Sequence, residues 1–209
     1  MYSIKEIYYT IQGEGHHTGQ PAIFCRFSGC NLWSGLEKDR STAICQFCDT
    51  NFWGTDGING GKYDAAGLVD ECVRLWSSEH EDQPFIVCTG GEPMLQLDQE
   101  LLDSFHASGC YVAIESNGTK PILKGIDWVC ISPKANAKLV VESGDELKLV
   151  YPQDGISIRD YENMDFSHFS LQPLDDAYQQ DNIMTCIELC KANPLWKLSL
   201  QTHKLVGMP

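Results

Sequence analysis

The fold is constrained most by a series of short apolar runs that alternate with helical patterns. Six runs have the length and composition of core strands, namely residues 22–27, 85–88, 111–115, 128–131, 147–151 and 169–172. Amphipathic spacing predicts three long helices, over residues 64–79, 95–107 and 178–192. Strands that are separated by crossovers in this way predict a mainly parallel sheet.

Polar residues, glycines and prolines follow these strands at their carboxyl ends, the edge that carries the chemistry in α/β barrels. Two crossovers, residues 116–127 and 133–146, are too short and polar for long helices. A closed eight-unit barrel also needs about 250 residues. We therefore expect an α/β fold: an incomplete (βα) barrel forming a single domain over residues 1–209, with about six parallel strands and about three long helices. Weaker strand patterns lie at residues 3–11 and 198–200.

The charge of the chain bears on the class of ligand. The formal net charge is −14, and the 15 Lys and Arg residues are scattered. Nucleic-acid binding depends on basic side chains that neutralise phosphates, so we expect a small-molecule substrate and no nucleic acid. No apolar run approaches the roughly 20 residues that span a bilayer, and the first residues lack a secretory pattern. We expect no membrane association and a cytoplasmic location.

Ten cysteines are many for such a chain, and most fall in apolar patterns that are typical of buried thiols. Cys30, Cys45 and Cys48 instead lie in a loop after the first core strand. Three thiolates can hold an iron–sulfur cluster and leave one iron open to another ligand. Zinc is an alternative, but it needs a fourth ligand, which would have to come from His16 or His17. A redox dithiol is another, although the residues after Cys48 do not predict a helix.

Two segments resemble radical S-adenosylmethionine enzymes: Ser-Gly-Cys-Asn-Leu at residues 28–32, and Cys-Asp-Thr at residues 48–50. The Thr-Gly-Gly-Glu-Pro turn at residues 89–93 follows the next strand and resembles the segment that receives the methionine group in that superfamily. The usual spacing there is C-x3-C-x2-C, whereas here Ser34 stands at the second position. We interpret residues 34–44 as an insertion within a cluster-binding strand and loop over residues 22–52.

More closely, the chain resembles the family of 7-carboxy-7-deazaguanine synthases. The segments that carry this resemblance are residues 10–15, 26–30, 48–50, 89–93, 115–118, 132–134 and 201–204. The resemblance implies a carbon–nitrogen lyase of 7-deazapurine and queuosine biosynthesis. Such an enzyme converts 6-carboxy-5,6,7,8-tetrahydropterin to 7-carboxy-7-deazaguanine with loss of ammonia.

The resemblance also implies the cofactors and partners. These are a [4Fe-4S] cluster, S-adenosylmethionine as the source of a 5′-deoxyadenosyl radical, and Mg²⁺. A flavodoxin- or ferredoxin-type reductant and a homodimer are further implications. No catalytic side chain is expected beyond the cofactor-generated radical. Two alternatives stay open at this point: an activase that acts on a partner protein, and a non-catalytic zinc- or cluster-binding module.

The resemblance assigns site residues in three groups. The cluster takes Cys30, Cys45 and Cys48, and Mg²⁺ takes Thr50, whose hydroxyl is a hard oxygen ligand. The residues expected at S-adenosylmethionine are Phe47, Cys48, Asp49, Gly91, Glu92, Ser132, Pro133, Lys134 and Gln172. The residues expected at the substrate are Gln12, Gly13, Glu14, Arg26, Thr89, His203 and Pro209.

Residue chemistry agrees with the substrate group. Gln12 and Glu14 can read the flat donor–acceptor edge of a pterin. Arg26 offers a bidentate partner for its carboxylate, and a structural ion pair is the alternative role for Arg26. We also expect the C-terminal tail, which includes His203 and Pro209, to fold over the pocket.

Overall fold

The computed structural model describes residues 1–77 and 82–208. Its strands form one sheet in the order β3-β1-β2-β4-β5-β6-β7-β8-β9. Their bounds are β1 (Tyr2–Ile11), β2 (Pro21–Phe27), β3 (Gly61–Tyr63), β4 (Phe85–Gly90), β5 (Tyr111–Ser116), β6 (Trp128–Ile131), β7 (Ser143–Tyr151), β8 (Asp165–Pro173) and β9 (Trp196–Leu198). Every neighbouring pair from β2 to β9 is parallel, whereas β1 is antiparallel to β2 and β3.

This sheet confirms the predicted incomplete barrel, because β3 and β9 form its two ends and do not pair with each other in the described chain. All six predicted core strands are present. The weak pattern at residues 198–200 corresponds to β9, which lies two residues earlier, and β3 was not predicted. The two crossovers that were judged too polar, residues 116–127 and 133–146, contain no helix.

The helices are α1 (Ala65–Ser77), α2 (Gln99–Ala107), α3 (Gln179–Ala192) and α4 (Thr202–Val206). The predicted second helix starts later than expected, because Asp98 caps it by accepting a hydrogen bond from the Leu101 amide at 3.1 Å. The end of the first predicted helix, residues 78–79, lies outside the described residues. The short α4 at residues 202–206 was not predicted.

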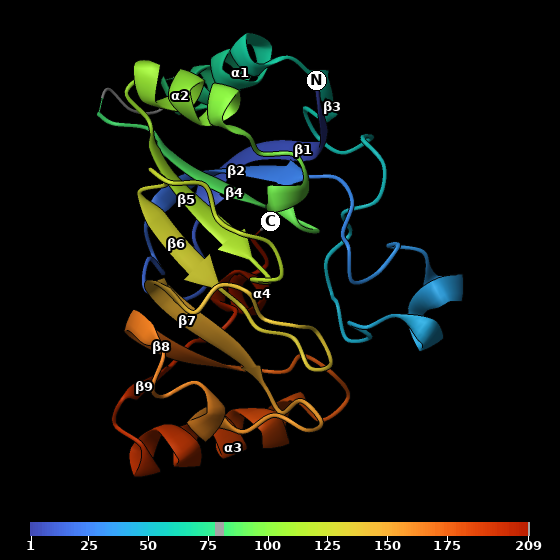
Figure 1. The fold of residues 1–209 in the computed structure, drawn as a ribbon, viewed down its shortest axis with the longest axis vertical. Coiled ribbons are helices and arrows are strands. Elements are labelled where there is room, and N and C mark those ends of the chain that lie inside the picture. The colour runs from blue at the N-terminus through green and yellow to red at the C-terminus, as the bar shows by residue number, and fades with distance from the viewer. Residues whose placement is uncertain (78–81, 209) are drawn as a thin grey trace.

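Helices cover the sheet in two places (Figure 1). The pair α1 and α2 packs over the β1, β2 and β5 half, above a core that includes the fully buried Leu68, Ile86 and Leu101. Helix α3 packs on β8 and β9, above a second core that includes Leu149 and Leu171. The strands under these helices therefore turn one face to a core and the other face to the interior of the open barrel.

Strand β7 shows how the interior becomes polar. Successive side chains of a strand point to opposite faces. Leu147 and Leu149 pack into the second core, while Glu146 and Lys148 point into the barrel and meet polar partners there. Glu146 and Lys148 are thus buried polar residues on the face of β7 that points into the barrel.

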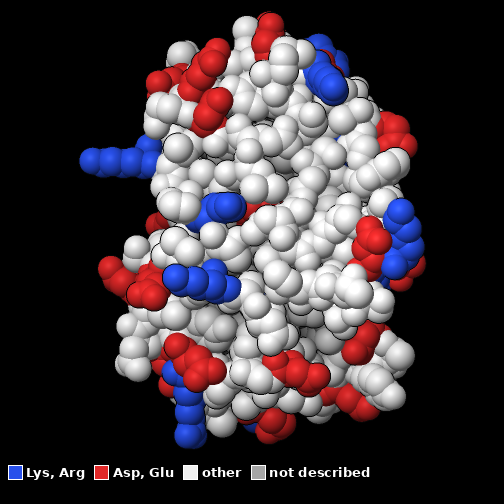
Figure 2. Space-filling view, turned by 45° about the vertical axis from the view of Figure 1, so that its right-hand side comes forward, with Lys and Arg blue, Asp and Glu red and all other residues white. Residues whose placement is uncertain are grey.

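The surface of the described chain is acidic, and none of its helices could cross a bilayer. No helix in the described part of the chain has the length and apolarity needed to cross a bilayer. On the face shown in Figure 2, acidic side chains are spread widely and basic ones lie singly among them. That distribution agrees with the acidic net charge of −14.

Candidate functional site

Two adjoining pockets open at the carboxyl ends of the strands. We call the first the cysteine pocket; its lining includes Cys30, Phe47, Gly91, Ser132 and Gln172. We call the second the arginine pocket; its lining includes Tyr8, Gln12, Gly13, Arg26 and His203. A shared wall borders both, consisting of Glu14, Asp49, Thr50, Thr89, Glu115 and Gln201.

The loop after β2 brings the three predicted cluster thiols to one pocket. Fourteen residues separate Cys30 from Cys45. The chain nevertheless folds back, because the amides of Ile44 and Cys45 both donate to the Leu32 carbonyl, at 3.0 and 3.3 Å. Cys30, Cys45 and Cys48 all line the cysteine pocket as a result.

The insertion at residues 34–44 contains a 3-10 helix over Glu37–Thr42. Its Arg40 guanidinium lies 4.1 Å from the ring centroid of Trp33. The same group donates to the carbonyls of Gln46 and Cys48, at 2.9 and 3.0 Å. The insertion is therefore tied directly to the segment that carries the second and third thiols.

Electrostatics at the three thiols are set mainly by burial. Burial raises the pKa of Cys30 and of Cys48, and raises that of Cys45 to about 11. The Lys134 ammonium opposes this effect at Cys45 and Cys48. The three cysteines carry free thiols.

The thiols share a pocket without meeting at one point. Within residues 1–77 and 82–208, no group of three or more His, Cys, Asp and Glu residues could hold a single metal ion. An iron–sulfur cluster binds each thiolate to a different iron, so thiols arranged in this way fit such a group.

The Gly-Gly-Glu turn after β4 packs tightly against the cysteine loop. A Cβ atom on Gly91 would lie 2.1 Å from the Gly29 carbonyl oxygen, so only glycine fits there. Glu92 is fully buried, and it is absent from the pocket lining. Its carboxylate accepts hydrogen bonds from the Ser116 hydroxyl and the Asn117 amide, at 2.9 and 2.8 Å. Burial raises the pKa of Glu92 despite these bonds.

The segment after β6 contributes two of its three predicted residues to the cysteine pocket. Ser132 and Lys134 line it, and the Lys134 ammonium donates to the Ser132 carbonyl at 2.8 Å. Pro133 does not line it, and its carbonyl accepts from the Gln153 amide at 3.3 Å. Gln172, at the end of β8, lines the same pocket.

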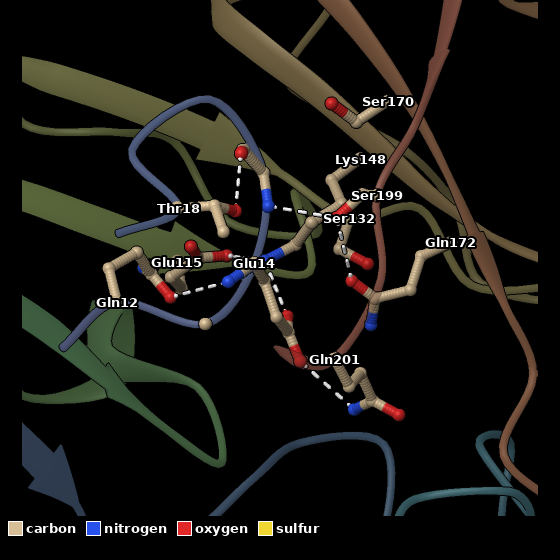
Figure 3. A network of polar contacts seen from close by, with 12 residues as sticks. Gln12, Glu14, Thr18, Glu115, Ser132, Lys148, Ser170, Gln172, Ser199 and Gln201 are labelled. Carbon is tan, nitrogen blue, oxygen red and sulfur yellow. Dashed lines mark hydrogen bonds and ion pairs between the residues drawn. The ribbon is translucent and has the colours of Figure 1, made fainter. Parts of the chain in front are cut away.

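The shared wall contains an ion network that the sequence analysis missed. The buried Lys148 ammonium lies 2.8 Å from the Glu14 carboxylate and 2.8 Å from the Glu115 carboxylate. The second Glu14 oxygen accepts from the Gln201 amide at 2.9 Å (Figure 3). Burial favours neutral carboxyls, but Lys148 and the hydrogen bonds hold the pKa of Glu14 below its usual value. Burial prevails at Glu115, whose pKa is raised.

Arg26 combines both roles that the sequence left open. Its Nε donates to Glu6 at 2.8 Å, and its Nη2 donates to the Tyr8 hydroxyl at 2.9 Å, so an ion pair is present. The same side chain lines the arginine pocket. Gln12 also lines that pocket, and its side-chain oxygen accepts from the Glu14 amide at 3.1 Å.

The C-terminal segment lies against the site. His203 packs on Gly13, where a Cβ atom would come within 2.3 Å of the His203 Nδ1. Burial lowers the pKa of His203. The Lys204 ammonium binds the carboxylates of Asp49 and Asp175, each at 2.5 Å. Pro209, the last predicted substrate residue, lies outside the described residues.

The two histidines considered for a zinc site lie elsewhere. His16 stacks on Trp128 and lies 4.1 Å from His168, measured between ring centroids. His17 packs edge-on against Trp128 at 4.3 Å. Neither histidine lines the cysteine pocket.

Comparisons with known proteins find relatives that span nearly the whole chain. No protein-family model matches the chain. It is 56% identical over 209 residues to 7-carboxy-7-deazaguanine synthase of Burkholderia multivorans, covering 100% of this chain and 99% of the relative. The corresponding protein of Bordetella pertussis is 52% identical, with the same coverage. The crystal structure of QueE from Escherichia coli matches with a TM-score of 0.73 and 27% identity, covering 97% of this chain and 94% of that one.

Proposed function

The chain belongs to the 7-carboxy-7-deazaguanine synthase family, and on that premise we propose how its two pockets divide the reaction. It is a lyase of 7-deazapurine and queuosine biosynthesis that converts 6-carboxy-5,6,7,8-tetrahydropterin to 7-carboxy-7-deazaguanine with loss of ammonia. This membership overturns the two alternatives of an activase and a non-catalytic metal-binding module.

The cysteine pocket is the proposed cofactor site, with Cys30, Cys45 and Cys48 as cluster ligands. A bound cluster and S-adenosylmethionine would supply a 5′-deoxyadenosyl radical. The residues proposed to bind S-adenosylmethionine include Phe47, Cys48, Asp49, Gly91, Ser132, Lys134 and Gln172, all of which line this pocket. Glu92 and Pro133, which do not line this pocket, complete the proposed set of residues that bind S-adenosylmethionine.

The arginine pocket is the proposed substrate site. Arg26 supplies the cation for the substrate carboxylate, and Glu14 accepts hydrogen bonds from ring N–H groups. Gln12, Gly13, Thr89 and His203 complete the described part of this site, and Pro209 is proposed to join them.

Mg²⁺ is proposed to bind at Thr50. Its hydroxyl offers one hard oxygen, and Mg²⁺ commonly fills its remaining positions with water and substrate oxygens. Thr50 borders both pockets, which supports a metal that touches the substrate.

The shared wall is the observation that carries this assignment. The predicted cluster ligands line the cysteine pocket, whereas Gln12, Arg26 and His203 line only the arginine pocket. A substrate in the second pocket would therefore lie next to a cofactor in the first. Radical transfer requires such proximity.

Four further properties are proposals of the same kind. A single domain is supported by the one continuous sheet. A homodimer, a flavodoxin- or ferredoxin-type reductant and a cytoplasmic location follow from the family resemblance. Light scattering of the reconstituted protein tests the dimer.

Anaerobic reconstitution tests the division of the reaction. We expect about four irons per chain, release of 5′-deoxyadenosine on reduction, and 7-carboxy-7-deazaguanine detected by its absorbance when the carboxy-tetrahydropterin is added. Iron and deoxyadenosine without product would contradict the substrate assignment. Retention of zinc with neither activity would contradict the cofactor assignment.

A further inference from the structure

Lys148 is a buried cation for which the assigned roles have no use. It stands on β7 between Leu147 and Leu149, both fully buried in the second core. Its own side chain is 5% exposed and points into the barrel, where it lines the cysteine pocket. Burying an ammonium is costly unless opposite charges compensate for the lost water.

Two carboxylates provide that compensation, and they come from distant parts of the chain. Glu14 follows β1 and Glu115 lies near the end of β5. Each places one oxygen 2.8 Å from the Lys148 ammonium. Both carboxylates also belong to the shared wall, so one cation joins two acids that border both pockets.

Several other titratable groups face this trio. They are Tyr8 from β1, Cys130 from β6, Glu146 from β7 and His203 from α4. Two carboxylates that share a buried site cannot both ionise readily without a cation between them. Lys148 is the ammonium that contacts both in the described chain, and its pKa is raised well above the usual value.

We propose that Lys148 is a positioning residue for this reaction: by binding Glu14 and Glu115 together, it holds the two acids in place on the shared wall against the N–H-rich ring of the substrate. The inference rests on the proposed substrate site. Lys148 acts through the two acids and does not itself touch the reacting atoms. Its removal should therefore weaken substrate binding more than it changes the cofactor site.

The test compares Lys148→Met with Lys148→Arg in the reconstituted enzyme. For Lys148→Met we expect kcat/KM for 6-carboxy-5,6,7,8-tetrahydropterin to fall about 100-fold, mainly through KM. Iron content and dithionite-driven cleavage of S-adenosylmethionine without substrate should stay within about twofold, because the ion pairs of Lys148 go to Glu14 and Glu115 and not to the residues proposed to hold the cluster or S-adenosylmethionine. Lys148→Arg keeps the charge and should recover most of the loss, to within about tenfold of the original.

The pH profile separates positioning from a structural role. Without Lys148, Glu14 and Glu115 should keep a shared proton up to a higher pH. Because the protonated pair accepts fewer hydrogen bonds from the substrate, KM of Lys148→Met should fall as pH rises. Adding Glu115→Gln should abolish that dependence, while any dependence from His203 stays. The losses of Glu115→Gln and Lys148→Met should not multiply, because both break the same contact.

The outcomes separate two failures. If the unaltered chain cleaves S-adenosylmethionine but makes no product from the pterin, the proposed substrate site fails. If it makes product and Lys148→Met has an unchanged KM, loses its iron, or multiplies its loss with Glu115→Gln, the inference on Lys148 is wrong. If Lys148→Met does not fold, the double variant that combines Lys148→Met with Glu115→Gln decides. The inference requires this double variant to bind substrate no better than Glu115→Gln alone, and tighter binding would contradict it.

Discussion

Arg40 offers the sharpest prediction about the insertion, because it reaches from the 3-10 helix to the thiol-bearing segment. It donates to the carbonyls of Gln46 and Cys48, at 2.9 and 3.0 Å, and stacks on Trp33. We predict that Arg40→Met loosens the loop over residues 43–50 and speeds the loss of a bound cluster. The fold of the sheet should not change, because Arg40 lies outside both apolar cores.

The magnitude follows from the contacts. A hydrogen bond from a charged group contributes roughly 1.5–3 kcal/mol when sheltered, and stacking on an aromatic ring adds about 0.5–1 kcal/mol at an exposed site. The Arg40 side chain is 29% exposed, so the lower values apply. The pair with Glu37, which is 77% exposed, adds little. Loss of the two carbonyl hydrogen bonds together should lower the local stability of the loop by about 3 kcal/mol. The equilibrium constant for loop opening should then rise on the order of 100-fold.

Hydrogen exchange measures that opening in the metal-free protein. The Ile44 and Cys45 amides both donate to the Leu32 carbonyl, so their exchange reports the closed loop. Iron release to a chelator under anaerobic conditions measures the consequence for the cluster. The matched control is Arg74→Met, which removes a similar pair with Glu71 on the surface of α1. Equal exchange and iron release in the two variants would refute the reasoning.

Three further predictions address the pockets. Gly91→Ala should prevent the tight packing of its turn, because the new Cβ would lie 2.1 Å from the Gly29 carbonyl; iron bound after reconstitution should fall, and a normal iron content would contradict this. Arg26→Ala should raise KM for the pterin about 10- to 100-fold with iron unchanged, and a collapse in iron would make Arg26 purely structural. Lys204→Met should free the C-terminal segment from Asp49, which faster exchange of the amides at residues 202–208 would show and unchanged exchange would disprove.

The sequence predicted the fold well where its signal is local. Apolar runs such as residues 85–88 became β4, because burial of both sheet faces leaves few alternatives to a core strand. The short β3 carries no such signal, since it depends on pairing with β1, far away in sequence. The start of α2 was misplaced because the run from Leu95 onward continues the helical spacing, whereas the Asp98 cap fixes the actual boundary.

The site was predicted through motifs, and motifs do not record which contacts a side chain already makes. Glu92 is predicted to meet the cofactor, and the motif does not show that its carboxylate also accepts hydrogen bonds from Ser116 and Asn117 at the end of β5. Arg26 was offered two alternative roles, and the structure gives it an ion pair and a place in a pocket together. In both cases the deciding partners lie on other segments of the chain.

Lys148 could have been found from the pattern of its own strand. A parallel strand that is buried on both faces normally reads as continuous apolar sequence, but residues 146–149 alternate as Glu-Leu-Lys-Leu. That alternation predicts one polar face toward a barrel interior. It cannot fix the height of each side chain along the barrel: Glu146 accepts hydrogen bonds from the His16 amide and Ser170, whereas Lys148 reaches the shared wall. Periodicity thus identifies which strand residues face the interior, and only the position of β7 relative to Glu115 on β5 and Glu14 after β1 selects the one that serves the site.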